Sequence, residues 1–436
     1  MNVSAYEQRR ARLAAQMGRG VAIIPTAPER VRNRDAHYPY RFDSYFYYLT
    51  GFREPEAVLI VIAGGGTAKS MLFCRERDPE REVWDGFRYG PEAARETFGF
   101  DEAHAIAQLD ALVPGLLADC SVVYCHLGAD SAWDARLMGW VNEVRAQARR
   151  GVTAPDALKD VHALLDEMRL VKAPEELELM RRAAAISAGG HRRAMRAARP
   201  GMGEFEIEAE LLHEFRRHGA QAPAYTPIVA AGGHACVLHY VENSGEMKDG
   251  ELLLIDAGCE LDGYASDITR TFPVNGRFTA PQRDVYEVVL AAQAAAIAQV
   301  KAGNAWEEPH VAAVRTISQG LIDLKLLAGS VDEVMEREAY KQFYMHRTGH
   351  WLGLDVHDAG DYKRGGQWRK LEPGMVLTVE PGCYIRAGEG IPRELAGIGV
   401  RIEDDVLVAE RGNEVLTRDA PKVIADIEAL MAGRDG

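Results

Sequence analysis

The sequence predicts an α/β N-terminal domain followed by an α+β C-terminal domain. From about 20 to 125, short β-rich runs such as VAIIP and AVLIVIAGG alternate with segments of helical character. This alternation is typical of a sheet covered by helices. Further along, strands bounded by glycine are interspersed among helices, which favours a mostly antiparallel sheet with helices on its outer side. The 436 residues are also enough for two cores.

We expect the domain boundary near residue 170, which gives domains 1–170 and 171–436. The segment 155–200 is almost continuously helical in its apolar period. It is interrupted at Pro174, which is followed by two glutamates and is therefore typical of the first turn of a new helix.

In the C-terminal domain, two sets of elements are expected. The helices are at 174–198, 204–218, 281–302 and 306–324. The strands are at 225–230, 236–241, 251–257, 265–273, 375–380 and 399–408. Two strand pairs, LLLIDAG with SDITRTF and MVLTVEPG with VRIEDDVLV, resemble each other in their acidic residues. Two copies of one half-domain facing each other would produce this echo.

The composition excludes several classes of protein. The 51 basic and 65 acidic side chains give a net charge of −14, which disfavours nucleic acid and anionic membranes as partners. No apolar run reaches the roughly 20 residues of a membrane span. The six cysteines contain no CxxC pair and the N-terminus has no apolar core, so we expect a reduced, cytoplasmic protein without a signal peptide.

Four carboxylates occur on strands that otherwise look like core. Asp256 ends an apolar strand and Asp267 lies within the returning strand, so a hairpin brings them together. Glu380 closes another apolar strand, and Arg401 and Glu403 share one strand face. Each acid alone would be an ordinary surface residue. If four carboxylates converge, their mutual repulsion must be offset by protonation or by cations. One arginine supplies too little positive charge for this, so a pair of divalent ions is predicted.

Histidines complete this predicted set. His346, His350 and His357 all fall within MHRTGHWLGLDVHD. One such histidine is more often a core residue, but three so close together favour a ligand. Oxygen donors with imidazole suit Mn²⁺, Co²⁺, Zn²⁺ or Fe²⁺. Two ions that share a water lower its pKa and polarise a carbonyl, which indicates hydrolysis of an amide or ester.

These motifs resemble a known family. The runs LIDAG, SDITRTF, GHWLGLDVHD, TVEPG and GVRIEDD are similar to those of the pita-bread metallopeptidases, which include aminopeptidase P, prolidase and methionine aminopeptidase. RNRDAHYPYRFDSYFYYLTGFREPEAVLIV resembles the N-terminal domain of aminopeptidase P. The resemblance implies a metal-dependent Xaa-Pro aminopeptidase that uses a hydroxide bridging two metals. A prolidase, with or without organophosphate side activity, is the alternative. A metal-free binding module is a third possibility, which the complete ligand set disfavours.

The resemblance also implies roles for individual residues. The implied metal ligands are Asp256, Asp267, His350, Glu380 and Glu403, with Asp267 and Glu403 as bridges. The implied catalytic residues are Glu380, His357, His239, His346 and Arg401. The implied substrate contacts are His239, His346, His357, Tyr225, Tyr384, Asp35 and Trp84, the last two at the site of a neighbouring subunit. The family's loop arginine corresponds to Arg364 or Arg369. Two divalent ions per subunit, Mn²⁺ foremost, peptides with an Xaa-Pro N-terminus, and a homodimer or homotetramer are expected.

Overall fold

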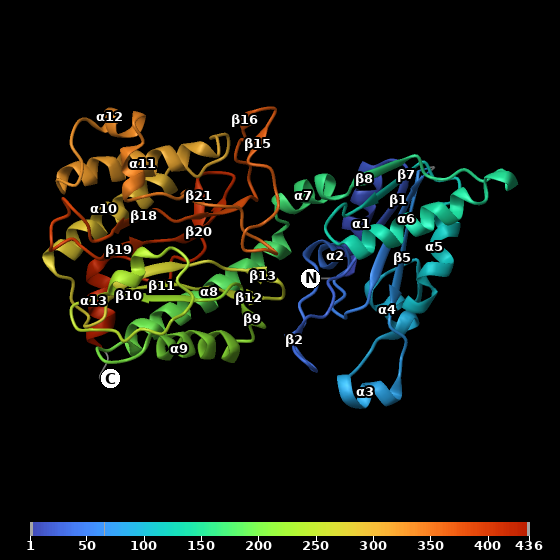
Figure 1. Ribbon diagram of the computed structural model, residues 1–436, viewed down its shortest axis with the longest axis horizontal. Helices are drawn as coiled ribbons and strands as arrows, with labels where there is room; N and C mark the ends of the chain where they lie inside the picture. Colours follow the sequence, from blue (N-terminus) through green and yellow to red (C-terminus); the bar gives the residue numbers. More distant parts are fainter. Residues whose placement is uncertain (1–2, 65, 434–436) are drawn as a thin grey trace. The chain divides into compact units, whose positions relative to one another are not determined.

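The computed structural model describes residues 3–64 and 66–433 of the chain. The chain divides into two compact units, Met1–Met168 and Arg169–Gly436 (Figure 1). Among the described residues, no helix is both long enough and apolar enough to cross a membrane.

A mixed six-stranded sheet forms the centre of the N-terminal unit. In spatial order its strands are β6 (Glu102–Ala105), β5 (Thr67–Cys74), β4 (Val58–Gly64), β1 (Gly20–Pro25), β7 (Val122–Cys125) and β8 (Ala157–Asp160). β4 is antiparallel to β1 and β5, whereas β1 and β8 run parallel to β7, and β6 runs parallel to β5. A separate ribbon is formed by β2 (Val31–Asn33) and β3 (Ala36–His37).

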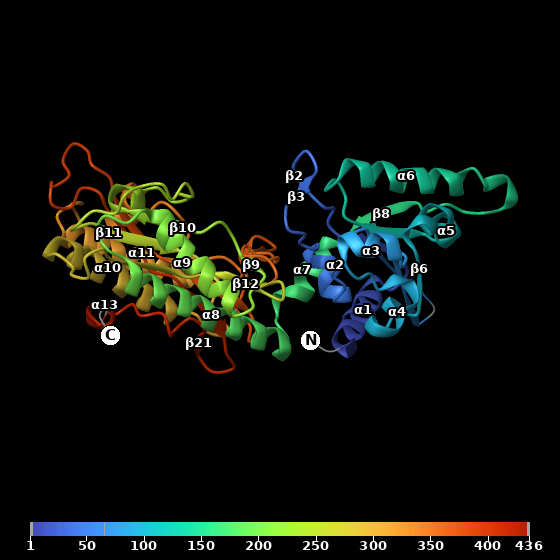
Figure 2. The ribbon, with the colours of Figure 1, turned by 90° about the horizontal axis from the view of Figure 1, so that it is seen from below.

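Helices cover both faces of this sheet, which confirms the predicted α/β class. The helices of this part of the chain are α1 (Val3–Met17), α2 (Ser44–Thr50), α3 (Pro79–Asp85), α4 (Gly90–Phe98), α5 (Leu109–Leu117), α6 (Ser131–Arg145) and α7 (His162–Leu170), with short 3-10 helices at Ile106–Gln108 and Ala148–Arg150. Of these, α3 buries none of its residues and does not cover the sheet. Leu109, Val113 and Leu117 recur every fourth residue of α5 and pack in the core beside Trp140 of α6. Figure 2 shows α6 on one face of the sheet and α1 and α4 on the other.

The C-terminal unit is built on antiparallel strands, as predicted. The sheets are β10-β11-β14, β13-β12-β9 and β17-β20-β21, with the pairs β18-β19 and β15-β16, and every one of these pairings is antiparallel. The strands are β9 (Ala222–Pro223), β10 (Ile228–Ala231), β11 (Leu252–Asp256), β12 (Cys259–Leu261), β13 (Tyr264–Ala265), β14 (Thr269–Pro273), β15 (Lys363–Arg364), β16 (Gln367–Trp368), β17 (Val376–Val379), β18 (Gly382–Ile385), β19 (Ile398–Arg401), β20 (Asp404–Val408) and β21 (Asn413–Val415).

Two helix pairs flank these strands, and Figure 1 shows α8 and α9 on one side and α10 and α11 on the other. The helices are α8 (Pro174–Ala197), α9 (Glu204–Arg217), α10 (Ala280–Ile297), α11 (Glu307–Asp323), α12 (Val331–Glu336) and α13 (Ile424–Ala432), with 3-10 helices η3 (Gly232–Cys236) and η4 (Ala339–Gln342). The four long helices were all predicted, and α8 begins at Pro174. Each helix pair lies beside one of the two strand pairs that carry the predicted ligand acids. This agrees with the two similar half-domains expected from the sequence.

The strand predicted at 236–241 is wrong. No strand forms at 236–241, where η3 is followed by irregular chain. At 236–241, side-chain contacts with Glu204, such as that of the Tyr240 hydroxyl, replace the strand hydrogen bonds. The histidine segment 346–357 is irregular as well; it contacts the sheets through an isolated bridge from Trp351 to Leu377 and a backbone hydrogen bond from Ala265 of β13 to Gly353 at 2.8 Å.

The strands predicted at 265–273 and 399–408 are real but interrupted. The breaks fall at Asp267 and Glu403, two of the predicted ligands, so Asp267 does not lie within the returning strand as expected. The backbone N–H of Asp267 donates to the carboxylate of Asp405 at 3.1 Å, and that of Glu403 donates to a carbonyl of β14 at 3.0 Å. These amides link the two acid-bearing strand pairs instead of extending their ladders.

A buried ion cluster lies at the start of the C-terminal unit. The carboxylate of Asp358 accepts from Arg169 at 2.5 Å and from Lys172 at 2.9 Å, and all three side chains are only 1% exposed. Burial opposes the charge of Asp358, but Lys172 and Arg169 hold the pKa of its carboxyl below the usual value. The cluster ties the segment before α8 to the histidine-bearing segment.

The Asp358→Asn variant should be much less stable at pH 7. It removes the carboxylate that two buried cations share: Lys172 loses this ion pair, whereas Arg169 retains its ion pair with Asp355, so the cost is up to about 3–5 kcal/mol in the free energy of unfolding. Because the folded pKa of Asp358 is depressed, its ion pairs stabilise the protein above the unfolded value of about 3.9 and lose that effect as pH falls through the folded pKa. The variant should therefore show a flatter decline in stability below about pH 4. Urea unfolding at several pH values measures both effects.

Glu414→Gln is the matched control. Its partner Arg181 is 39% exposed and Glu414 is 32% exposed, so this surface pair should contribute no more than about 1 kcal/mol. Equal destabilisation by the two substitutions would contradict the assignment of a special role to the buried cluster.

Candidate metal centre

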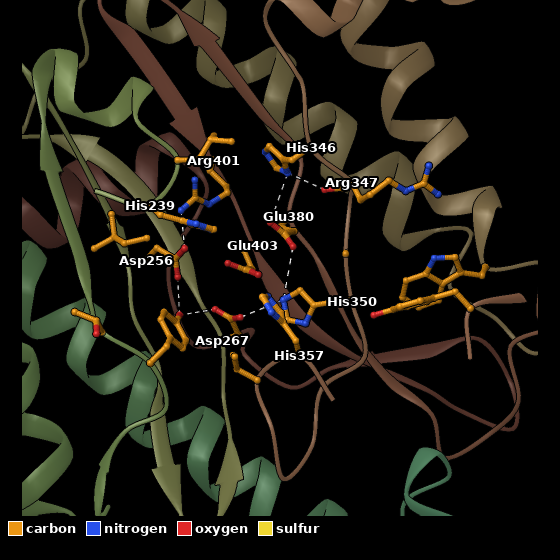
Figure 3. Close-up of a pocket in the computed structure, with 18 of the residues that line it drawn as sticks. His239, Asp256, Asp267, His346, Arg347, His350, His357, Glu380, Arg401 and Glu403 are labelled. Atoms are coloured by element: carbon orange, nitrogen blue, oxygen red, sulfur yellow. Dashed lines mark hydrogen bonds and ion pairs between the residues drawn. The ribbon is translucent and has the colours of Figure 1, made fainter. Parts of the chain in front are cut away.

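The five predicted metal ligands line one cavity of about 1100 Å³ in the C-terminal unit (Figure 3). They come from the ends of β11 and β17, the two strand breaks and the histidine segment. Asp267, His350 and Glu403 each offer an atom within 4.8 Å of the others. The fold therefore gathers residues that are spread over almost 150 positions of the sequence, from 256 to 403.

Tyr225 lies between the first two acids. Its hydroxyl is 2.6 Å from Oδ1 of Asp256 and also contacts Oδ1 of Asp267. Asp256 pairs in register with Thr269, so Asp267 lies two residues before that partner. A tyrosine hydroxyl has one hydrogen to donate, so it cannot satisfy both carboxylates. The carboxylates of Asp256 and Asp267 therefore need further positive charge.

His350 presents its Nε2 atom to the acids. Its Nδ1 lies 2.9 Å from the carbonyl oxygen of Trp351, so Nδ1 carries the hydrogen in that contact. Nε2 is 3.4 Å from Oδ2 of Asp267 and 3.7 Å from Oε1 of Glu380. A backbone carbonyl that orients one ring nitrogen while the other faces carboxylates is a common arrangement around bound metals.

Glu403 is held by a short chain of hydrogen bonds. The hydroxyl of Thr269 donates to its Oε2 at 2.6 Å and accepts from Nε of Arg401 at 3.1 Å. Nη2 of the same arginine donates to Asp256 at 2.5 Å. Arg401 thus supplies one positive charge beside four carboxylates.

The pKa values show the same shortage of positive charge. Burial, followed by repulsion from Asp267 and Asp256, raises the pKa of Glu380 to about 7. Burial and Asp267 also raise the pKa of Glu403 well above its ordinary value. Burial opposes the charge of His350, yet Asp267 and Glu380 raise its pKa to about 9. Without added cations, the carboxylates of Glu380 and Glu403 would take up protons.

Tyr384 lies behind the cavity wall. It is fully buried, and its hydroxyl lies 2.8 Å from Nε2 of His346 and accepts from Nη1 of Arg401 at 3.1 Å. Burial and the nearby Arg401 lower the pKa of His346 to about 3, which keeps its ring neutral. Tyr384 therefore supports His346 and Arg401 from behind the wall, and its contact with substrate stays a prediction.

The other predicted substrate residues fall into two groups. His239 and His357 line the cavity, and the ring of His357 lies 4.3 Å from that of His350. Asp35 and Trp84 belong to the N-terminal unit, where Asp35 is exposed in the turn between β2 and β3 and Trp84 on α3 is 84% exposed.

The arginine expected from the loop 358–372 does not face the cavity. Within the described cavity wall, this loop contributes Tyr362, Lys363 and Trp368 rather than either candidate arginine, Arg364 or Arg369. These three residues were not singled out from sequence.

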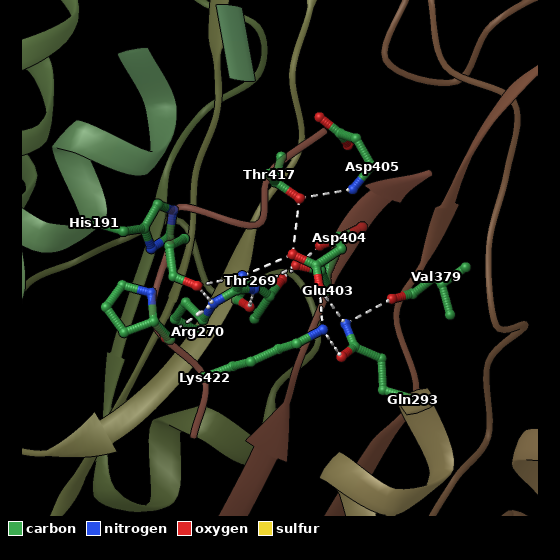
Figure 4. A network of polar contacts seen from close by, with 12 residues as sticks. His191, Thr269, Arg270, Gln293, Val379, Glu403, Asp404, Asp405, Thr417 and Lys422 are labelled. Atoms are coloured by element: carbon green, nitrogen blue, oxygen red, sulfur yellow. Dashed lines mark hydrogen bonds and ion pairs between the residues drawn. The ribbon is translucent and has the colours of Figure 1, made fainter. Parts of the chain in front are cut away.

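A buried network supports the ligands from behind (Figure 4). Arg270 donates to the carbonyl of Glu403 at 2.5 Å and to the carboxylate of Asp404 at 2.7 Å. Asp405 receives the backbone N–H of Asp267. The two acids that follow Glu403 are therefore structural. Three successive acids in an apolar strand were the sequence signal for this network, and only the first was interpreted.

Glu204 holds the loop that carries His239. It is the first residue of α9 and is fully buried. Its carboxylate accepts four hydrogen bonds of 2.7 to 2.9 Å, from the backbone N–H groups of Ala231 and Gly245, Nδ1 of His234 and the hydroxyl of Tyr240. The sequence offered no signal for this role, because a glutamate at a helix start is also favoured by the helix dipole.

The donor set fits divalent metal ions. Four carboxylates and one oriented imidazole lie together in the cavity wall, and the guanidinium of Arg401 and the hydroxyl of Tyr225 that contact them do not balance the four acids. Borderline and hard divalent ions take such mixtures of oxygen and nitrogen ligands. A centre of this kind is suited to hydrolysis.

Comparisons with known proteins agree with this chemistry. The model of metallopeptidase family M24 matches residues 178–410, and that of the aminopeptidase P N-terminal domain matches residues 6–124. The Xaa-Pro aminopeptidase of Haemophilus influenzae is 47% identical over 427 residues, which cover 98% of this chain and 96% of that protein. The Xaa-Pro aminopeptidase of Escherichia coli is 46% identical over 428 residues, covering 98% and 97%.

Solved structures give the same result. An aminopeptidase from Pseudomonas aeruginosa superposes with a TM-score of 0.98 at 53% identity, covering 100% of this chain and 99% of that chain. A variant of aminopeptidase P from Escherichia coli in complex with substrate gives a TM-score of 0.97 at 45% identity, with the same coverage.

The Glu204→Gln variant should loosen the His239 loop. A glutamine places an NH₂ group among four donors, so at least one of them loses its acceptor, at a cost of about 1–3 kcal/mol. Hydrogen exchange should accelerate at the backbone amides of Ala231 and Gly245.

Glu210→Gln, on the same helix, is the control, because Glu210 pairs with Arg193 at the partly exposed surface. Its loop exchange should match the wild type. Unchanged exchange in the Glu204→Gln protein would show that this carboxylate does not hold the loop.

Proposed function

This chain belongs to metallopeptidase family M24, and we propose that it is an Xaa-Pro aminopeptidase that removes the first residue from peptides with proline in second position. The convergence of four carboxylates and His350 in one cavity carries the proposal. The match to the aminopeptidase P N-terminal domain and the relatives' names favour this activity over that of a prolidase.

The substrate bond explains the need for such a site. The nitrogen of an Xaa-Pro bond carries no hydrogen, so a peptidase cannot hold it as a strand donor. Recognition then depends on the carbonyl, the free amine and the proline ring. The acidic end of the cavity suits the substrate's ammonium group, which makes the enzyme an exopeptidase.

Two divalent ions would be held by Asp256, Asp267, His350, Glu380 and Glu403. When bound, they lower the pKa of a water molecule and polarise the substrate carbonyl. Mn²⁺ is our first choice, with Co²⁺, Zn²⁺ and Fe²⁺ as alternatives, because the same donors accept all four and availability selects among them.

Chain residues would carry the proton and the developing charge. Glu380 faces His350 and His346 across the cavity and would move a proton from the attacking water to the proline nitrogen, which must be protonated to leave. His357 would donate to the carbonyl oxygen as negative charge develops. His239 would contact the peptide, and Arg401 would orient Asp256 and Glu403 through the contacts described above.

We propose a homodimer or homotetramer in which Asp35 and Trp84 approach the site of a neighbouring subunit. The high exposure of Trp84 supports this, since a tryptophan that is 84% exposed is suited to burial by a partner. We also propose a cytoplasmic location, which six cysteines without disulfides support.

The His350→Ala variant should lose Xaa-Pro cleavage by at least about 100-fold, because even outer partners of metal ligands are worth 10–100-fold. Steady-state kinetics with added Mn²⁺ measures the loss. The exposed His218, which pairs with Glu214, provides the His218→Ala control and should keep wild-type activity. Full activity in the His350→Ala protein would overturn the site assignment.

A tripeptide Xaa-Pro-Yaa and the dipeptide Xaa-Pro separate the two candidate activities. The wild-type protein with Mn²⁺ should release the first residue from the tripeptide, and product analysis by chromatography detects it. Hydrolysis confined to the dipeptide would identify a prolidase instead.

A further inference from the structure

The cavity carries opposite charges in its wall. Four carboxylates surround the metal positions, whereas Arg347 and Lys363 line another part of the same wall with Trp368. At about 1100 Å³ the cavity is slightly larger than the 300–1,000 Å³ typical of small-ligand sites. It therefore has room for more of a peptide than the two residues that flank the cleaved bond.

A tight hairpin builds this cationic part of the wall. β15 and β16 pair antiparallel, with Lys363 opposite Trp368. The connecting Gly365 and Gly366 have φ of 55° and 78°, left-handed values that a two-residue turn of this type requires and glycine adopts without strain. Opposite residues share a sheet face, so Lys363 and Trp368 face the cavity and Arg364 lies on the other face.

Trp368 fixes the position of the lysine ammonium. Nζ of Lys363 lies 4.0 Å from the centroid of the Trp368 ring, within cation–π range. No ion pair of Lys363 is found in the part of the chain that the structure describes. Its charge is ordered by the ring but not neutralised by a carboxylate.

Arg347 differs from Lys363 in this respect. Its guanidinium lies 5.2 Å from the Trp368 centroid, but it contacts both carboxylate oxygens of Glu307. Its charge is therefore already paired. Of the two cations beside Trp368, Lys363 is the one able to receive an anion from a ligand.

Aromatic stacking connects this hairpin to the metal ligands. Trp351, which follows His350, is stacked with Tyr362 at 5.7 Å and 4° between ring planes. Trp306 packs against both rings, at 4.1 Å and 4.7 Å. Tyr362, which precedes Lys363, is thus anchored to Trp351, which follows the predicted ligand His350. Lys363 therefore has a defined position relative to the reacting bond.

We propose that Lys363, held over Trp368, forms a subsite for a carboxylate that the peptide carries beyond its proline. This inference rests on the proposed function, which places the substrate's ammonium end among the acids and directs the rest of the peptide toward the other part of the wall. The carboxylate is either the C-terminal group of a tripeptide or the acidic side chain of the residue after proline. Because the ammonium is already ordered, binding loses little side-chain entropy.

Two pairs of peptides test the subsite in the Mn²⁺-loaded full-length enzyme. Ala-Pro-Ala is compared with its C-terminal amide, and Ala-Pro-Glu-amide with Ala-Pro-Gln-amide. The wild type should favour the acidic member of at least one pair by about fivefold in kcat/KM, mainly through KM, which is the upper range for a partly exposed ion pair. The preferred pair identifies which carboxylate is bound.

Lys363→Met should abolish this preference and keep the cleavage of the neutral peptides. Arg364→Met, which removes the same charge from the opposite face of the hairpin, should retain it. A wild-type enzyme that cleaves both members of each pair equally, or a preference that survives Lys363→Met, would overturn the subsite. Failure of the wild type to cleave any of the four peptides would instead overturn the proposed function.

Discussion

Crowding of negative charge in one buried cavity is the constraint on which the C-terminal unit depends. Asp256, Asp267, Glu380 and Glu403 converge there, and Arg401 offsets one of the four charges. Burial alone makes charged carboxylates costly, and their mutual repulsion adds to the cost. A protein can satisfy such a cluster with protons or with metal ions. The two divalent ions proposed above would supply the positive charge that Arg401 does not, and the oriented imidazole of His350 would complete the ligand set.

Backbone hydrogen bonds hold the chain firmly around these acids. Two strands break at ligand positions, and the freed amides join one acid-bearing strand pair to the other. Arg270, Asp404 and Asp405 then fix the segment that bears Glu403. Because these polar groups are buried and paired, the proposed ligands would be held in place before any ion or substrate arrives, which is the condition for efficient metal catalysis.

Much of this arrangement could be predicted from the sequence, and the misses have physical reasons. Helices with strong apolar periods and a proline start, such as α8, were predicted correctly, as were acids that end apolar strands, such as Asp256. The breaks at Asp267 and Glu403 were missed because strand propensity does not register hydrogen bonds to distant carboxylates. Glu204 was missed because its four partners come from a loop 27 to 41 residues away. The hairpin at Lys363 has strands of only two residues, too short for a periodic signal.

The number of metal ions per chain tests the central claim most directly. After loading with Mn²⁺ and removal of free metal, elemental analysis should find two ions per wild-type chain and fewer in the Glu403→Ala variant, which lacks an acid facing both predicted positions. A wild-type protein that retains no ion, or a Glu403→Ala protein that still retains two, would contradict the account.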